Sequence, residues 1–161
     1  MSANVVDNMA DKMLGLAKRN FLADGFVHNI VLVITGDGKI SHLRMDDYPR
    51  ALQPLMVQIA ANSSDASLVI HISEAWMATE IAGKEIGLPP SEREDKQEVI
   101  LVHVRSRWGT QAYRSTQIDR QPQGVQFVKP NSIFDGMEGT YQSRLLDHAF
   151  DPIAVKGRAA S

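Results

Sequence analysis

The sequence predicts an α+β domain, with a mainly antiparallel sheet of five or six strands and two or three packed helices. Three observations support this fold class: an amphipathic N-terminal segment, a β-rich hairpin around "GDGK", and a second β-rich hairpin around "RWGT". A helix and a lone strand lie between the hairpins, and this order is typical of helices packed against one antiparallel sheet.

A helix is expected first, over residues 4 to 22. Apolar residues recur at every fourth position, which places them near one face of a helix. They are Val5, Met9, Met13, Ala17 and Phe21, and Val6, Leu14 and Leu16 widen the stripe. Such a stripe is typical of a core-facing helix, so its methionines need no cofactor to explain them.

The first hairpin is expected to join a strand at 27–35 to a strand at 39–45 through the turn "DG". The first strand is apolar on both parities, which indicates that both of its faces are covered. The length of the turn decides the register. A two-residue turn puts His28 and His42 on opposite faces, and a three-residue turn puts them on the same face.

A second helix is expected over 46–62, with Asp46 or Asp47 as its cap and Pro49 in its first turn. Its expected buried residues are Leu52, Leu55, Met56, Ile59 and Ala60.

The rest of the chain is expected to form a strand at 67–76, an exposed connection at 79–97, a hairpin at 98–119, a short strand at 125–128 and a C-terminal helix at 133–149. The connection contains two adjacent prolines and a charged run, which favours a loop.

Composition narrows the possible classes of protein. A chain of 161 residues suffices for a single domain spanning 1–161, with frayed ends at 1–3 and 155–161. Cysteine is absent, which excludes disulfides, zinc–thiolate sites and a thiol nucleophile. The chain has no apolar run long enough to cross a membrane and no secretory leader. Together with the absence of cysteine, which suits a reducing compartment, this leads us to expect a cytoplasmic protein.

Nucleic acid is not an expected partner. Seventeen basic and nineteen acidic side chains give a formal charge of −2, and binding to a phosphate backbone needs a dense basic face. The nearest approach to such a face is a set of arginines spread over the second expected hairpin: Arg105, Arg107, Arg114 and Arg120.

Two polar residues interrupt the apolar strand "VIHISEAWMA" (69–78). Because side chains alternate along a strand, Glu74 shares a face with Ile72 and Trp76, and His71 lies on the other face. A carboxylate on an apolar face requires hydrogen bonds or an ionic partner. We therefore predict that Glu74 anchors the end of its strand, by accepting hydrogen bonds from backbone amides or from a basic side chain near the loop after Trp76.

Four histidines fall on expected strands: His28, His42, His71 and His103. Two of them on neighbouring strands could hold a metal ion. The sequence contains neither an HExxH pair nor a GxSxG elbow, and we expect no metal and no cofactor. Whether the domain is an enzyme stays open. The alternative interpretation is a small hydrolase that uses Glu74 with His71 or His103.

The stretches "SEAWMA" (73–78) and "PPSEREDKQEVILV" (89–102) resemble a pattern in a family of uncharacterised bacterial and phage proteins. In that family, a strand ending in Ser-Glu-Ala-Trp-Met leads through an acidic loop with Pro and Ser into an apolar strand. The resemblance covers residues 20 to 120. It implies a shared fold and a shared Glu74–Trp76 feature, and it implies no activity.

The favoured interpretation is a non-catalytic module that binds a protein partner or itself. The observations behind it are the missing catalytic motifs and the length of the 79–97 connection, because long loops are often functional. The candidate binding residues are Trp76, Ser91, Glu92 and Arg93. We expect a homodimer or larger assembly, formed through a sheet edge or through this connection.

Overall fold

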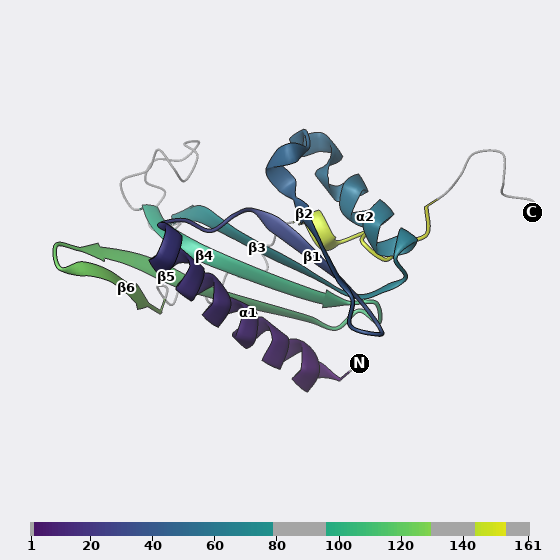
Figure 1. Ribbon diagram of the computed structural model, residues 1–161, viewed down its shortest axis with the longest axis horizontal. Helices are drawn as coiled ribbons and strands as arrows, with labels where there is room; N and C mark the ends of the chain where they lie inside the picture. Colours follow the sequence, from purple (N-terminus) through teal and green to yellow (C-terminus); the bar gives the residue numbers. More distant parts are fainter. Residues whose placement is uncertain (1, 79–95, 130–143, 154–161) are drawn as a thin grey trace, which may run out of the picture.

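The computed structural model describes residues 2–78, 96–129 and 144–153 (Figure 1). In these residues six strands form one sheet, and every neighbouring pair of strands is antiparallel. Two α-helices pack against the sheet. The predicted fold class, α+β, is therefore confirmed.

The strand order in the sheet is β2-β1-β3-β4-β5-β6. The strands are β1 (Ile30–Thr35), β2 (Ile40–Arg44), β3 (Ala66–Ala78), β4 (Lys96–Ser106), β5 (Gln111–Gln121) and β6 (Gly124–Val128). Within the described residues, β2 and β6 are the outer strands, and each has one edge without a neighbouring strand.

The two helices cover opposite faces of the sheet (Figure 1). Helix α1 (Ala3–Asp24) packs across β4 and β5, on what we call the α1 face. Helix α2 (Gln53–Ser63) packs over β1 and β3, on what we call the α2 face. Strand β1 contributes buried or half-buried side chains to both cores, as its two-sided apolar pattern predicts.

Helix α1 forms where the sequence predicts it, but its buried stripe differs in the first two turns. The buried residues are Val6, Ala10, Met13, Ala17 and Phe21, whereas Val5 is exposed and Met9 is only half-buried. A strict spacing of four residues drifts around a helix that has about 3.6 residues per turn. The observed stripe corrects this drift with one step of three.

The first hairpin has a three-residue turn. Ile34 pairs with Ile40 and Leu32 pairs with His42, so His42 lies on the same face as His28. Gly38 in the turn has φ 88°, a left-handed conformation that favours glycine. This finding decides between the two registers that the sequence left open.

The second helix is shorter than predicted. Two 3₁₀ turns, Met45–Asp47 and Arg50–Leu52, precede α2, and Pro54 lies in its first turn. Proline is well tolerated there because the first N–H groups of a helix have no partner within the helix. We expected Pro49 in this role, and it instead precedes the second 3₁₀ turn.

The predicted buried face of this helix is wrong for three of its five residues, while Met56 and Ala60 are half-buried and Ala60 packs against the core. Leu52, Leu55 and Ile59 are exposed, while Val57 and Ala61 face the sheet. Residues 53–63 are uncharged and largely apolar, so periodicity alone fits more than one face. The small Val57 and Ala61 allow the helix to lie close to β1 and β3.

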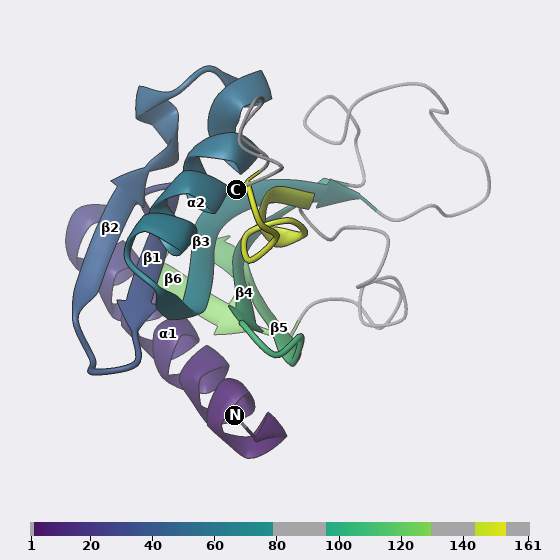
Figure 2. The ribbon, with the colours of Figure 1, turned by 90° about the vertical axis from the view of Figure 1, so that its right-hand side faces the viewer.

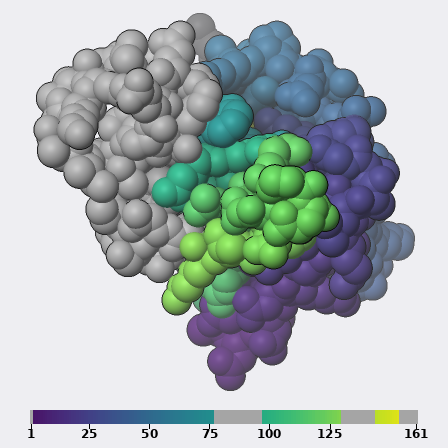
Figure 3. Space-filling view, turned by 90° about the vertical axis from the view of Figure 1, so that its left-hand side faces the viewer, coloured from purple at the N-terminus to yellow at the C-terminus, as the bar shows by residue number. Residues whose placement is uncertain are grey.

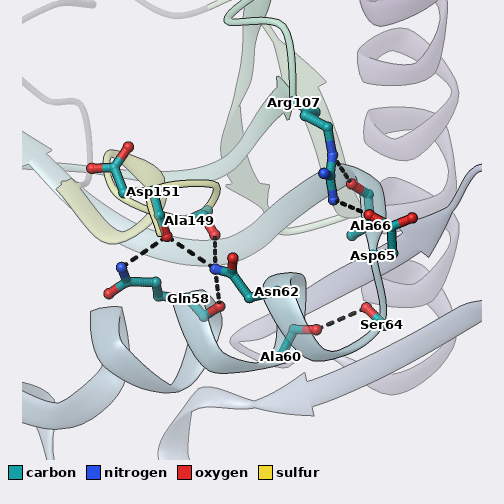
Figure 4. A network of polar contacts seen from close by, with 9 residues as sticks. All are labelled: Gln58, Ala60, Asn62, Ser64, Asp65, Ala66, Arg107, Ala149 and Asp151. Carbon is teal, nitrogen blue, oxygen red and sulfur yellow. Dashed lines mark hydrogen bonds and ion pairs between the residues drawn. The ribbon is translucent and has the colours of Figure 1, made fainter. Parts of the chain in front are cut away.

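The C-terminal segment 144–153 lies beside α2 (Figure 2) and begins with the 3₁₀ turn Arg144–Leu146. Residues 133–143 of the predicted C-terminal helix are outside the described residues, and no α-helix forms at 144–149. The side chains of Gln58 and Asn62 each donate to the Asp151 carbonyl at 3.0 Å (Figure 4). These bonds hold the segment against α2.

In the described ranges, no helix combines the length and the apolar character that a membrane-spanning helix needs.

Candidate functional site

Glu74 is half-buried on the α1 face and accepts a hydrogen bond from the backbone N–H of Val27. The prediction of a backbone-amide donor is confirmed for this residue, but the position of the donor was wrong. Val27 lies in the connection from α1 to β1, not near the loop after Trp76. Glu74 therefore holds this connection against the sheet.

A charged cluster of Arg120 and Glu98 lies next to Glu74. Arg120 belongs to β5, which with β6 is drawn in green in Figure 3. Two nitrogens of Arg120 donate to the two carboxylate oxygens of Glu98, each at 2.8 Å. The Arg120 guanidinium also lies over the ring of Phe21, 5.4 Å from its centroid. Since Glu74 and Glu98 both have partners, the shallow hollow that they line with Trp76 offers no unpaired carboxylate.

Of the predicted binding residues, the structure describes only Trp76. Its backbone pairs with that of Glu98, and its side chain is 44% exposed. Ser91, Glu92 and Arg93, with the rest of 79–95, lie outside the described residues.

His71 and His103 form a directly opposed pair on β3 and β4, on the α2 face. Their rings have separate hydrogen-bond partners, because Nε2 of His71 lies 2.7 Å from Oδ1 of Asn29 and Nε2 of His103 lies 2.8 Å from Oε1 of Gln111. The ring of His103 also stacks on Tyr113, with centroids 4.1 Å apart.

Both imidazoles are neutral at physiological pH. Burial, together with a smaller effect of the neighbouring His103, lowers the pKa of His71 to about 4. Burial likewise lowers the pKa of His103 to about 4; the Gln111 hydrogen bond opposes this shift, while the charge of Arg105 adds to it. A neutral imidazole can accept a proton or bind a metal.

The structure does not assemble the residues of the hydrolase alternative. Glu74 is on the α1 face and the two histidines are on the α2 face, so the sheet separates the carboxylate from both rings. In the part of the chain that the structure describes, no three histidine or acidic side chains gather in a metal-binding cluster. The absence of a metal and of a cofactor stays a prediction.

The arginines of the second hairpin do not form a basic surface. Arg114 donates to Asp11 at 2.7 Å and to Asp7 at 3.2 Å, which ties β5 to α1. Arg107 pairs with Asp65 at 2.8 Å, as Figure 4 shows, and Arg120 is paired with Glu98. Arg105 points to the α2 face.

The sequence interpretation missed a groove on the α1 face. Helix α1 crosses β4 and β5 and leaves β1 and β2 partly open beside it. A cavity of about 150 Å³ lies in this gap, which we call the α1–β1 groove. The side chains that line it are mostly apolar: Leu16, Ala17, Asn20, Asp24, Phe26, Val27, His28, Ile30, Leu32 and Ile72.

Exposed apolar side chains mark the opening of the groove. Phe26 is 46% exposed and Leu16 is 36% exposed, although both line the cavity. Ile40 on the outer strand β2 is 63% exposed and pairs with Ile34 on the same face. The sequence signal was Leu16, which we counted as widening the buried stripe of α1 and to which we gave no separate role.

In comparisons with known proteins, no protein-family model, no curated protein and no solved structure matches this chain.

Proposed function

We propose that this domain is a non-catalytic protein-binding module and that the α1–β1 groove is its binding surface. The observation that carries the proposal is the convergence of exposed apolar side chains on a small cavity. Clusters of exposed apolar side chains often mark protein-interaction sites. A cavity of about 150 Å³ is smaller than most small-molecule sites, which measure about 300–1,000 Å³. It suits one apolar side chain of a partner, in the way that anchor residues fill pockets at protein interfaces.

The polar groups of the groove favour binding over chemistry. His28 lines the cavity, but its Nδ1 accepts a hydrogen bond from Arg44 at 3.4 Å, and its ring packs edge-to-face on Phe26. The imidazole therefore has a structural role at the rim. Away from the groove, Glu74 and the two strand histidines are each held by hydrogen bonds to other parts of the chain.

Selection from a library of random peptides, displayed on phage and presented to the purified protein, tests this function. We expect the selected peptides to share an aromatic or aliphatic residue. Their binding should be lost in Leu16→Glu, which puts a charge at the cavity, and kept in Leu22→Glu. Leu22 is an exposed leucine of the same helix that does not line the groove. Peptides that bind Leu16→Glu as well as the natural protein would contradict the proposal.

Self-association through a sheet edge is a second candidate, favoured by the composition of β6. This outer strand contains no charged residue, whereas exposed edge strands usually carry charges that prevent pairing. We expect light scattering at high micromolar concentration to give at least the mass of a dimer. Gln126→Lys, on the exposed part of β6, should reduce that mass, and Gln123→Lys in the preceding turn should not. A monomer mass for the natural protein would contradict this candidate.

A further inference from the structure

We propose that two copies of this chain join edge to edge through β6, with the two β6 strands antiparallel and related by a twofold axis at Gln126. This inference rests on the second candidate for the proposed function, self-association through a sheet edge, and specifies which residues of the two copies meet. Two observations carry it: the direction of the backbone groups at the open edge of β6, and the symmetry of the β6 sequence.

The open edge of β6 presents the backbone N–H and C=O groups of Val125 and Phe127. A two-residue turn joins Gln121 of β5 to Gly124 of β6, and the residues that close such a turn exchange backbone hydrogen bonds. Backbone groups alternate in direction along a strand, so those of Val125 and Phe127 point away from β5. The carbonyl of Val128 agrees with this alternation, because it accepts a hydrogen bond from a β5 side chain at 3.2 Å. Within the described residues, no strand pairs with the side of β6 that faces away from β5.

The sequence of β6, GVQFV, carries an apolar residue on each side of Gln126. A twofold axis at Gln126, perpendicular to the sheet, sets Val125 opposite Phe127 of the second copy. The outward N–H and C=O groups of these two residues then bond to each other across the edge, and the whole of β6 is paired. An axis at Phe127 would instead set Val125 opposite Lys129. An axis at Val125 would set Phe127 opposite the turn residue Gln123.

The proposed pairing also extends the apolar core of the α1 face. Val125 and Phe127 are half-buried and pack against that core. A twofold axis perpendicular to the sheet keeps the α1 faces of both copies on the same side, so the exposed parts of these side chains meet across the edge. Apolar cross-strand pairs of this kind stabilise a sheet.

The other outer strand, β2, does not suit this kind of pairing. Its central residue is His42, and a twofold axis there would set Arg44 opposite Ile40 of the second copy. The same axis would set His42 opposite itself. Basic residues on an edge strand discourage pairing between copies. The sequence therefore favours β6 over β2 as the edge that joins two molecules.

A dimer through β6 leaves the α1–β1 groove open. The groove lies beside β1, which β3, β4 and β5 separate from β6 in the strand order. Each dimer therefore carries two grooves, near the far ends of the joined sheet. A partner with two anchor segments would gain affinity by binding both grooves at once.

The absence of cysteine from the chain allows a cross-linking test of the register. In the proposed dimer, Gln126 faces its own equivalent in a pair without backbone hydrogen bonds, where Cα atoms lie about 4.5 Å apart. A disulfide spans Cα atoms about 4.4–6.8 Å apart, so Gln126→Cys should form a linked dimer under mild oxidation. Gln123→Cys is the matched control at an exposed position of the preceding turn, and its equivalent lies about 20 Å away along the strands. Non-reducing gel electrophoresis should show that Gln126→Cys links at least about tenfold faster than Gln123→Cys.

A charge exchange tests whether Gln126 faces a second copy of itself. Gln126→Lys and Gln126→Glu each place like charges opposite each other at the axis, which should raise the dissociation constant of the dimer about fivefold. A mixture of the two variants should restore the dimer, because lysine then faces glutamate. The same two substitutions at Gln123 should leave the dissociation constant unchanged, both alone and mixed. Analytical ultracentrifugation measures these constants, and circular dichroism shows whether each variant is folded.

The outcomes separate the register from self-association itself. If the natural protein is a dimer but Gln123→Cys or Val125→Cys links as fast as Gln126→Cys, the axis at Gln126 is wrong and self-association stands. A dimer that the mixed Gln126 variants fail to restore would also overturn the register. A monomer mass for the natural protein at high micromolar concentration would overturn both this inference and the self-association candidate. The binding groove is tested separately, by the peptide selection.

Discussion

The two faces of the sheet differ in where their polar residues lie. On the α1 face, the centre is apolar, and the charged residues Glu74, Arg114 and Arg120 lie at its margins with hydrogen-bonded partners. On the α2 face, two histidines lie opposite each other in the middle of the sheet. Partners and water reach the groups at the margin, whereas burial lowers the pKa of both central histidines. We therefore expect the stability of the fold to depend on packing at the α1 face and on pH at the α2 face.

The largest effect is expected for Phe21→Ala on the α1 face. Phe21 is 2% exposed, packs edge-to-face on Phe127 with centroids 6.0 Å apart, and lies under the Arg120 guanidinium. Its removal should lower the free energy of unfolding by about 3–5 kcal/mol. Urea unfolding measures this change. The neighbouring Leu22→Ala, at an exposed position, should cost less than about 0.5 kcal/mol. Similar losses in both variants would show that α1 is not packed as described.

The second expected effect is a loss of stability at low pH, which arises on the α2 face and not on the α1 face. The folded-state pKa values of His71 and His103 are about 4, against 6.5 in the unfolded chain. Between these values the unfolded chain binds more protons, so stability is fully present above pH 6.5 and falls as the pH falls toward 4. Each histidine contributes up to about 3 kcal/mol over this window. Urea unfolding between pH 7 and pH 5 measures the loss of stability in the upper part of this pH window, where most carboxylates do not yet titrate.

Two single variants test whether this loss of stability in acid comes from the buried pair of histidines on β3 and β4. His71→Gln removes one of the two histidines whose pKa is lowered and should roughly halve the slope of unfolding free energy against pH. His42→Gln, at an exposed position on β2, should leave the slope unchanged. A slope that survives in both would place the acid lability outside the histidine pair.

The third effect concerns Glu74 at the margin of the α1 face. Glu74→Leu leaves the Val27 N–H without its acceptor and should destabilise the fold by about 1–3 kcal/mol. Glu74→Gln keeps a carbonyl acceptor and should cost less. Denaturant unfolding of the pair gives both values. A leucine variant as stable as the natural protein would show that Glu74 does not hold the α1–β1 connection.

The sequence predicted the strands and the first helix because their signals are local: turn residues, alternation and a stripe of apolar residues. The placement of Glu74 and His71 on opposite faces also followed from alternation. The opposition of His71 and His103 required the register between β3 and β4, which depends on residues far apart in the chain. The α1–β1 groove could not be predicted from the sequence, because it depends on which strands α1 crosses. The position of a helix on a sheet follows from tertiary packing, not from the helix's own periodicity.

The smallest effect is expected at α2, where the sequence interpretation chose the wrong face. Leu55 is exposed, so Leu55→Gln should change the free energy of unfolding by less than about 0.5 kcal/mol. Glutamine is also a good helix former, which removes a propensity penalty. Val57 is fully buried, and Val57→Thr should cost about 1–2 kcal/mol because it buries a hydroxyl without a partner in place of a methyl group. Urea unfolding of the two variants separates the faces of the helix. If Leu55→Gln proved the more costly change, the face predicted from the sequence would be the buried one.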